Sequence, residues 1–387
     1  MHVVINALSS RQGGGQTYLR NLLGFRPPAG TRVSVIATPA LRLPSLGAGV
    51  RRLDMPGPCA LPAIRLAWER WRLPALLREL DADVLFAPGG TLVTPVRPGC
   101  ATVTMFRNMV PFDPVQRARY PLGYGRARNA VLEHVLLDSM LSADLVIFVS
   151  EFARQVIERR AGGRLRRSVV IPHGVGRAFR ARPEAEPRPA WVGNGDYVLY
   201  VSTLEMYKAQ VEVVRAFARL RTLRPTPERL VLVGAEYPPY GARVREEIRR
   251  AGVGDVVAVR GEVVHDSLPA AYRHAKLVLF ASECENCPNI LLEAMAAGRP
   301  LLCSDRPPMP EFGGDAVEYF DPCSPEDLAA RMAELLDRPD RRAELGRLAE
   351  ERSRRYDWAD TVSRTWQAIQ ALHDGVATSA GGQGTTP

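Results

Sequence analysis

The chain has 387 residues, a length typical of two domains rather than one. Hydrophobic residues make up 46% of it and charged residues 24%, which excludes a largely disordered protein. The formal net charge is +9, but the basic residues are scattered and no aromatic ladder interleaves with them, so we expect no nucleic-acid partner. All but two of the 51 basic residues are arginine, which indicates the codon preference of a G+C-rich genome; the exceptions are Lys208 and Lys276.

No apolar run reaches the roughly 18–20 residues of a membrane-spanning helix. The first residues, Met1 to Ile5, enter a strand-like run without the basic and apolar regions of a secretory signal. The six cysteines suit a reducing compartment, and the CxxC pair Cys284 and Cys287 lacks a second pair that would complete a zinc site. We therefore expect a cytoplasmic protein, with peripheral contact to the inner face of the membrane left open.

Apolar strands, glycine or polar turns and amphipathic helices alternate along the whole chain, which predicts an α/β fold with parallel sheets covered on both faces. The predicted strands are residues 3–5, 33–36, 84–86, 101–105, 145–149 and 169–171, then 197–201, 230–233, 257–259, 277–280 and 301–303. A segment rich in proline, glycine and charge predicts a linker at residues 178–195, between a domain of residues 1–177 and one of 196–354. The small polar residues 377–387 predict a disordered tail.

One predicted helix in the first domain, residues 65–80, carries Trp68 and Trp71 within a basic rim. Docking on a membrane is one interpretation of this pattern. We favour the other, a helix that turns its apolar face to the core and leaves its arginines exposed.

The sharpest chemical signal follows the predicted strand at residues 277–280. A helix begins there with Asn289 as its expected N-cap and ends at Gly298, and the free amides at its N-terminus form a phosphate site. Glu285 lies in the loop before the helix, and Glu293 lies one turn inside it, where a carboxylate can accept hydrogen bonds from the two hydroxyls of a ribose.

Glu285 and Glu293 form an E-x7-E motif that resembles the donor site of retaining glycosyltransferases of GT-B fold, the large family four. Residues 198–210, which contain Lys208, resemble the family's strand and turn with a phosphate-binding lysine. Residues 148–157, 171–175, 261–272 and 310–316 resemble further landmarks. The glycine loop at residues 13–15 matches the family's first loop, whereas Tyr18 stands where a nicotinamide-binding G-x-G-x-x-G motif needs its last glycine.

The resemblance implies two facing doubly wound, Rossmann-like domains with a cleft between them: an acceptor-binding domain and a nucleotide-sugar-binding domain. A closing helix, residues 355–376, would cross back to the first domain. The resemblance also implies catalytic roles for Glu285, Lys208 and Arg107 and acceptor contacts from Gln16 and Asn108. The implied donor-binding residues are Gly14, Gly15, Thr203, Lys208, Asn286, Cys287, Pro288, Asn289 and Glu293. Neither a cofactor nor a metal is expected, and the nucleoside-diphosphate sugar is a co-substrate.

Three positions depart from the family pattern. Thr203 stands where an arginine is usual, Asn286 and Cys287 replace glycines, and Arg107 lies where many members have a histidine. Arg107 cannot act as a base near neutral pH, but it can stabilise charge on a departing phosphate.

The sequence thus predicts a retaining, metal-independent glycosyltransferase whose acceptor is a hydroxyl of an envelope glycan, a lipid-linked molecule or a small natural product. An epimerase or hydrolase of the same fold and a catalytically silent nucleotide-binding module remain alternatives. The sequence leaves the donor base and sugar open.

Overall fold

The computed structural model describes residues 1–10, 13–121, 123–180 and 186–381. The chain folds into two compact units. The first takes in residues of the segments 1–112, 122–173 and 358–387, and the second takes in residues 113–121 and 174–357. Residues 113–121 and 174–177, expected in the first domain, therefore belong to the second unit. Segment 113–121 is linked to that unit by contacts of Gln116 and Arg119 with Glu283.

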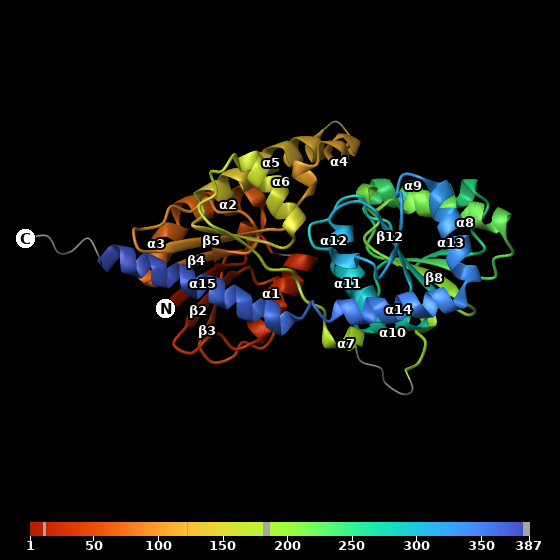
Figure 1. The fold of residues 1–387 in the computed structure, drawn as a ribbon. Helices are drawn as coiled ribbons and strands as arrows, with labels where there is room; N and C mark the ends of the chain where they lie inside the picture. The colour runs from red at the N-terminus through yellow and green to blue at the C-terminus, as the bar shows by residue number, and fades with distance from the viewer. Residues whose placement is uncertain (11–12, 122, 181–185, 382–387) are drawn as a thin grey trace, which may run out of the picture. The chain divides into compact units, whose positions relative to one another are not determined.

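The first unit is built on a seven-stranded parallel sheet of order β3-β2-β1-β4-β5-β6-β7 (Figure 1). Its strands are β1 (His2–Asn6), β2 (Arg32–Ala37), β3 (Val50–Asp54), β4 (Val84–Ala87), β5 (Ala101–Phe106), β6 (Leu145–Phe148) and β7 (Ser168–Val170). Its α-helices are α1 (Gly14–Gly24), α2 (Pro62–Trp71), α3 (Leu73–Glu79), α5 (Tyr124–Ser142), α6 (Glu151–Ala161) and α15 (Trp358–Gly381), with 3-10 turns η1 (Gly57–Ala60) and η2 (Val110–Phe112).

The second unit contains a six-stranded parallel sheet of order β10-β9-β8-β11-β12-β13. Its strands are β8 (Tyr197–Val201), β9 (Arg229–Val233), β10 (Val257–Val259), β11 (Leu277–Phe280), β12 (Leu301–Ser304) and β13 (Glu318–Phe320). Its α-helices are α4 (Pro114–Arg119), α7 (Arg177–Arg180), α8 (Gln210–Leu223), α9 (Pro238–Arg250), α10 (Leu268–His274), α11 (Asn289–Ala296), α12 (Met309–Gly313), α13 (Pro325–Asp337) and α14 (Pro339–Ser353). Its 3-10 turns are η3 (Ala190–Val192), η4 (Met206–Lys208) and η5 (His265–Ser267).

Central strands such as β1, β5, β8 and β11 are buried at every residue, as the near-continuous apolar runs of a doubly covered parallel sheet require. The strand order reverses beside β1 and β4 in the first sheet and beside β8 and β11 in the second. In open α/β sheets, ligands bind beyond the carboxyl ends of the strands at such a reversal. The loops after β1, β4, β8 and β11 are therefore the first places to examine for a site, together with the loop after β5, the next strand in the first sheet.

The α/β class and every strand predicted from the sequence are confirmed. Two strands, β3 and β13, are missed, because both lie at sheet edges where partial exposure removes the apolar run. The expected linker, residues 178–195, lies in part outside the described residues; its described part contains the end of α7 and the turn η3.

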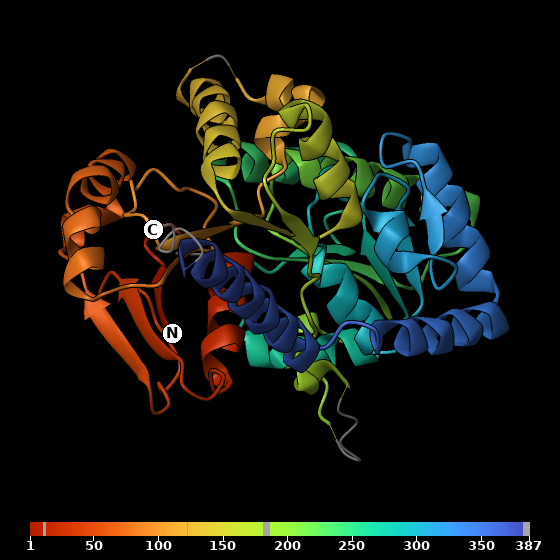
Figure 2. The ribbon, with the colours of Figure 1, turned by 60° about the vertical axis from the view of Figure 1, so that its left-hand side comes forward.

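The closing helix α15 lies against α1 in both ribbon views (Figures 1 and 2). A hydrogen bond of 3.2 Å joins the Tyr18 hydroxyl of α1 to Thr365 of α15, and the Thr361 hydroxyl donates to the carbonyl of Pro172 at 2.8 Å. Helix α15 extends to Gly381, through residues 377–381 of the expected tail, and the disorder of that tail stays a prediction. The remainder of the expected tail lies outside the described residues.

The single helix expected at residues 65–80 is two helices, α2 and α3. Leu73 and Leu77 of α3 are buried, as expected of a core-facing helix, whereas the expectation is wrong for α2. The residue of α2 that turns inward is Glu69, which is fully buried and accepts a hydrogen bond of 2.8 Å from the Asn6 side chain. Trp71 is 73% exposed. Within the part of the chain that the structure describes, no helix has both the length and the apolar character needed to cross a membrane.

Candidate functional site

The turn after β8 is shaped by close backbone contacts. Ser202 continues the sheet by donating its amide to Val233, and the chain then crosses over Gly234, where a Cβ would lie 2.1 Å from the carbonyl oxygen of Ser202. Only glycine fits this crossing, which has a φ of +144° at Gly234. Thr203 is exposed at the tip, and the side-chain amide of Gln210 donates to its carbonyl at 2.9 Å.

Lys208 lies at the end of η4 with its side chain nearly buried. Its backbone carbonyl accepts a hydrogen bond of 2.6 Å from Tyr200, which fixes the direction in which the side chain leaves the turn. The Lys208 ammonium forms an ion pair with Glu285 and lies 5.0 Å from the ring centre of Tyr207. A cation over an aromatic face is stabilised by the ring electrons. The structure therefore brings together two predicted site residues, Lys208 and Glu285, from the carboxyl ends of β8 and β11.

The loop after β11 contacts the η4 turn and contains a buried thiol. The amide of Glu283 donates to the carbonyl of Tyr207 at 2.7 Å, which ties this loop to the η4 turn. Burial raises the pKa of the Cys284 thiol well above its ordinary value, with Asp113 and Glu285 adding to the effect. A thiol held in its protonated form is a poor nucleophile and a poor metal ligand.

The helix after this loop, α11, begins at Asn289, and Pro288 takes the N-cap position without a side-chain hydrogen bond. The prediction of Asn289 as the N-cap is thus wrong by one residue, because Pro288 fixes the backbone just before the first turn. Asn286 is buried and Cys287 half-buried beside the N-terminus of the helix. Backbone amides at such an end are favourable donors to an anion.

Glu293 lies one turn inside α11 and is largely buried. Burial raises the pKa of its carboxyl group, and His265, whose Nε2 lies 3.8 Å from the carboxylate, partly opposes that rise. His265 comes from η5 and packs edge-on against Phe179 at 5.6 Å. The sequence offered no motif that pairs His265 with Glu293.

Segment 113–121 supports the same loop through Glu283, the carboxylate two residues before Glu285. Arg119 forms an ion pair with Glu283, and Gln116 donates to the second carboxylate oxygen at 3.2 Å. The Cys323 thiol also donates to that oxygen, at 3.5 Å. This network was not predicted, since its members lie far apart in the sequence and match no spacing rule.

The first unit holds the other predicted residues, at the carboxyl ends of β1 and β5. Gly13 has a φ of +57° and precedes α1, which begins at Gly14. A Cβ on Gly15 would lie 2.8 Å from Nη2 of Arg107, so a larger residue here would force the guanidinium to shift. Gln16 is half-buried in the first turn, and Asn108 is exposed.

Arg107 is a desolvated cation with an incomplete set of partners. Its Nη2 donates to Ser10 at 3.1 Å, whereas Nε and Nη1 are buried with no hydrogen-bond partner among the described residues. Burial lowers the pKa of Arg107 to about 10, so the group stays charged at neutral pH. Buried donors without partners are costly and mark places where a further acceptor can bind.

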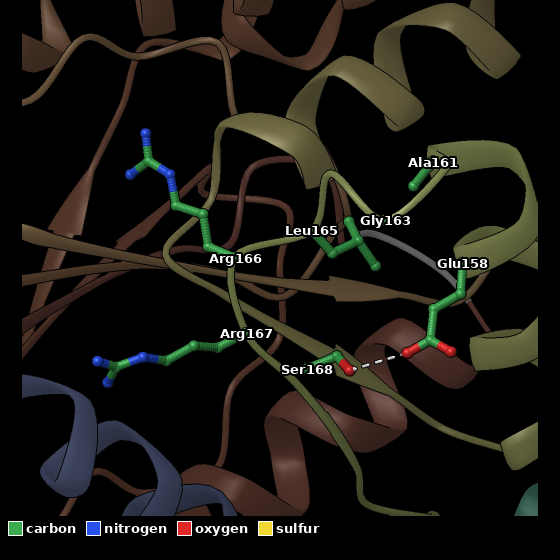
Figure 3. A pocket seen from close by; sticks show the side chains of 7 residues that line it. All are labelled: Glu158, Ala161, Gly163, Leu165, Arg166, Arg167 and Ser168. Carbon is green, nitrogen blue, oxygen red and sulfur yellow. Dashed lines mark hydrogen bonds between the residues drawn. The ribbon is translucent and has the colours of Figure 1, made fainter.

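A cavity of about 260 Å³ lies elsewhere in the first unit, at the turn between α6 and β7 (Figure 3). Its lining residues are Glu158, Ala161, Gly163, Leu165, Arg166, Arg167 and Ser168. The turn lies at the amino end of β7, whereas α/β proteins bind ligands beyond the carboxyl ends of their strands. No predicted site residue lines the cavity. Among the residues described, no group of three or more His, Cys, Asp or Glu side chains is arranged to hold a metal ion.

Two family models match this chain. Residues 12–178 match the model for Glycosyltransferase Family 4, and residues 181–352 match the model for Glycosyl transferases group 1, so that together they cover most of the sequence. The chain belongs to glycosyltransferase family 4. This glycosyltransferase carries the E-x7-E glutamates and Lys208 in the part matched by the group 1 model.

Curated relatives of the glycosyltransferase include O-antigen chain mannosyltransferase B of Escherichia coli, which is 25% identical over 69% of this chain and 71% of that protein. D-inositol 3-phosphate glycosyltransferase 2 of Catenulispora acidiphila is 29% identical over 45% of this chain and 44% of that protein. The match therefore spans less than half the length of the second relative.

Solved structures with the same fold include sucrose-phosphate synthase from Thermosynechococcus elongatus, with a TM-score of 0.77 at 16% identity over 97% of this chain and all of that one. Anabaena HepE in complex with UDP-glucose has a TM-score of 0.71 at 17% identity over 96% of this chain and all of that one. These likenesses establish that the glycosyltransferase has the fold of GT-B enzymes.

Proposed function

We propose that this glycosyltransferase moves a sugar from a nucleoside-diphosphate sugar to an acceptor hydroxyl with retention of anomeric configuration. The observation that carries the proposal is the ion pair between Lys208 and Glu285, held where β8 and β11 end. A buried cation beside a carboxylate suits a ligand that presents a diphosphate next to sugar hydroxyls. The family and the UDP-glucose complex of HepE support a nucleotide sugar as the donor.

In the proposed donor complex, Lys208 and the amides at the start of α11 bind the diphosphate, and Glu293 accepts hydrogen bonds from the ribose hydroxyls. Glu285 orients the transferred sugar through its hydroxyls. Thr203 and the segment from Asn286 to Asn289 complete the phosphate and sugar contacts. Each role uses chemistry that the side chain or backbone offers: a cation and amide donors for phosphate, and carboxylate acceptors for hydroxyls.

The proposed chemistry is a front-side displacement. The bond between the anomeric carbon and the phosphate oxygen breaks, the acceptor oxygen bonds to the same face of that carbon, and the acceptor proton passes to the departing phosphate. No protein nucleophile is required. The fixed positive charge of Lys208 stabilises the developing negative charge on the diphosphate.

In the first unit, we propose that Arg107 and the glycine loop at Gly14 and Gly15 bind an anionic group of the substrates. Nε and Nη1 of Arg107, which have no hydrogen-bond partner among the described residues, support this role. Gln16 and Asn108 are the proposed acceptor contacts. The acceptor is a hydroxyl of an envelope glycan or lipid-linked molecule, for which the O-antigen mannosyltransferase is the supporting relative, or of a small natural product.

We also propose that transfer needs no metal, since Lys208 and the α11 N-terminus supply positive charge to the leaving group. Turnover should be the same before and after dialysis against a chelator. Loss of activity that Mg²⁺ or Mn²⁺ restores would contradict this part of the proposal.

The proposal is tested by incubating the enzyme with a panel of nucleotide sugars, with and without candidate acceptors. Acceptor-dependent release of nucleotide is expected, and NMR of the product from an α-linked donor should show an α-linkage. Full turnover of the donor alone would indicate a hydrolase or epimerase. Nucleotide binding without release from any sugar donor would indicate a silent module, and a β-linked product would exclude retention.

A further inference from the structure

Helix α2 of the first unit carries apolar side chains on its solvent face. Leu61 is 58% exposed, Ile64 is 43% exposed and Trp71 is 73% exposed, with Trp68 half-buried between them. Residues three or four positions apart lie on the same side of an α-helix, so Ile64, Trp68 and Trp71 form a stripe. Leu61 is the N-cap residue just before it, and the four residues together are called the α2 stripe. Figure 2 shows α2 and α3 as two adjacent orange helices.

The orientation of α2 is fixed from the inside. Buried Glu69 accepts a hydrogen bond from Asn6 at the end of β1, and Arg65 approaches the same carboxylate at 3.7 Å. Trp71 follows Glu69 by two residues, which places it roughly 200° around the helix axis and therefore on the opposite side. The polar anchor at Glu69 thus turns the α2 stripe outward, which explains why so large a side chain as Trp71 remains in water.

The surroundings of the α2 stripe are cationic. Arg70 and Arg72 are exposed and form no ion pair with any residue that the structure describes. On α3, Arg78 and its acidic neighbour Glu79 are both exposed, whereas the one acidic residue of α2, Glu69, is buried. Helix α2 therefore combines an exposed apolar stripe with two neighbouring arginines, Arg70 and Arg72, that form no ion pair among the described residues.

We propose that α2 docks the enzyme on an anionic lipid surface. Tryptophan is favoured at the boundary between headgroups and acyl chains, and an amphipathic helix with a basic rim binds there by combining apolar burial with charge attraction. Unneutralised arginines complement anionic headgroups, each contributing on the order of a fivefold gain in binding. A neutral protein partner would leave Arg70 and Arg72 without counter-charges, so the charge pattern favours the membrane.

Docking of this kind needs no membrane-spanning helix and is independent of the proposed transferase activity. It assigns a binding role to a surface that contains none of the proposed donor or acceptor residues. Failure of the docking proposal and failure of the proposed function are therefore separable, because vesicle binding is measured without any nucleotide sugar.

The test is co-sedimentation of the full chain with vesicles of phosphatidylcholine alone or with roughly one-third phosphatidylglycerol. Binding is expected for the anionic vesicles and should fall as salt is raised. Leu61→Glu should weaken this binding about tenfold or more, because it removes an inserted apolar group and adds a negative charge. Leu223→Glu is the matched control, since Leu223 is 55% exposed at the end of α8, and it should bind like the wild type.

Fluorescence locates the contact. Anionic vesicles containing brominated lipid should quench the wild-type tryptophan emission, and Trp71→Phe should lose most of that quenching while retaining its thermal stability. Equal binding by Leu61→Glu and Leu223→Glu, or no binding to anionic vesicles, would overturn the proposal. So would a wild-type dimer in analytical ultracentrifugation that Leu61→Glu dissociates, because the α2 stripe would then be covered by a second copy.

Discussion

The Lys208–Glu285 ion pair should be strongly coupled, and a double-mutant cycle measures this directly. The single variants are Lys208→Met and Glu285→Gln. Each leaves one charge in a site where the two side chains are only 9% and 14% exposed. The double variant removes both charges, so it should regain much of the stability that either single variant loses.

The expected magnitude follows from burial and contact. Opposite unit charges about 4 Å apart attract by about 4 kcal/mol at an effective dielectric constant of 20. Desolvation of both groups offsets part of this attraction. We therefore expect a coupling free energy of about 2–3 kcal/mol, with each single variant destabilised by roughly 3 kcal/mol.

The assay is chemical unfolding of the four proteins, followed through the transition of the second unit. The matched control is the exposed pair Arg347 and Glu351, whose side chains are 68% and 69% exposed and 3.8 Å apart. The cycle with Arg347→Met and Glu351→Gln should give about 0.3–0.5 kcal/mol. A coupling at Lys208 and Glu285 no larger than this control would refute the reasoning that the pair is buried and structurally defined.

Four further outcomes follow. Burial raises the pKa of Glu293, so its contribution to stability is fully present below its unfolded pKa near 4.5 and is lost as pH rises through the folded pKa. Glu293→Gln should therefore gain stability relative to the wild type as pH rises above 4.5, and a constant difference would contradict this. Gly15→Ala should cost about 1–2 kcal/mol through its contact with Arg107, and this cost should vanish in an Arg107→Ala background. Gly24→Ala, at the other end of α1 with no atom within 4 Å, should be neutral or slightly stabilising in the same unfolding assay. Arg119→Gln should cost about 1–2 kcal/mol and raise amide hydrogen exchange in residues 113–121, whereas unchanged exchange would show that its ion pair does not hold the segment.

Local patterns in the sequence were sufficient to predict the strands, because a strand covered on both faces is a nearly continuous apolar run. β3 has the sequence Val-Arg-Arg-Leu-Asp and β13 has Glu-Tyr-Phe, and neither shows such a run. Edge strands are stabilised by backbone pairing on one side and tolerate charge, so their pairing partner, rather than their own composition, decides their structure.

The proposed donor residues were found because they lie close together in the sequence or follow strands in the predicted sheet. The pairing of Lys208 with Glu285 follows from the adjacency of β8 and β11, which the sequence alone does not specify. Arg119 and Glu283 could not be paired in advance, since segment 113–121 leaves the unit that contains its flanking residues.

Helix α2 shows how composition can mislead. Two tryptophans in an amphipathic pattern predict a face turned to the core. The hydrogen bond between Glu69 and Asn6 reverses the orientation, and a pattern of hydrophobic residues carries no information about that contact.

The central claim is that the second unit binds a nucleoside diphosphate through Lys208 and Glu293. We would measure the ligand-induced shift in the melting temperature of the wild type with UDP, GDP, ADP, CDP and dTDP, and repeat it for Lys208→Met, Glu293→Ala and Lys276→Met. Lys276 is the matched control because it is the other lysine of the chain and pairs with Asp196 and Glu228 at the amino end of β11. One diphosphate at about 100 times its Kd should stabilise the wild type and Lys276→Met by about 2.7 kcal/mol, with little or no shift in the other two variants. No shift with any diphosphate, or equal shifts in all four proteins, would contradict the account.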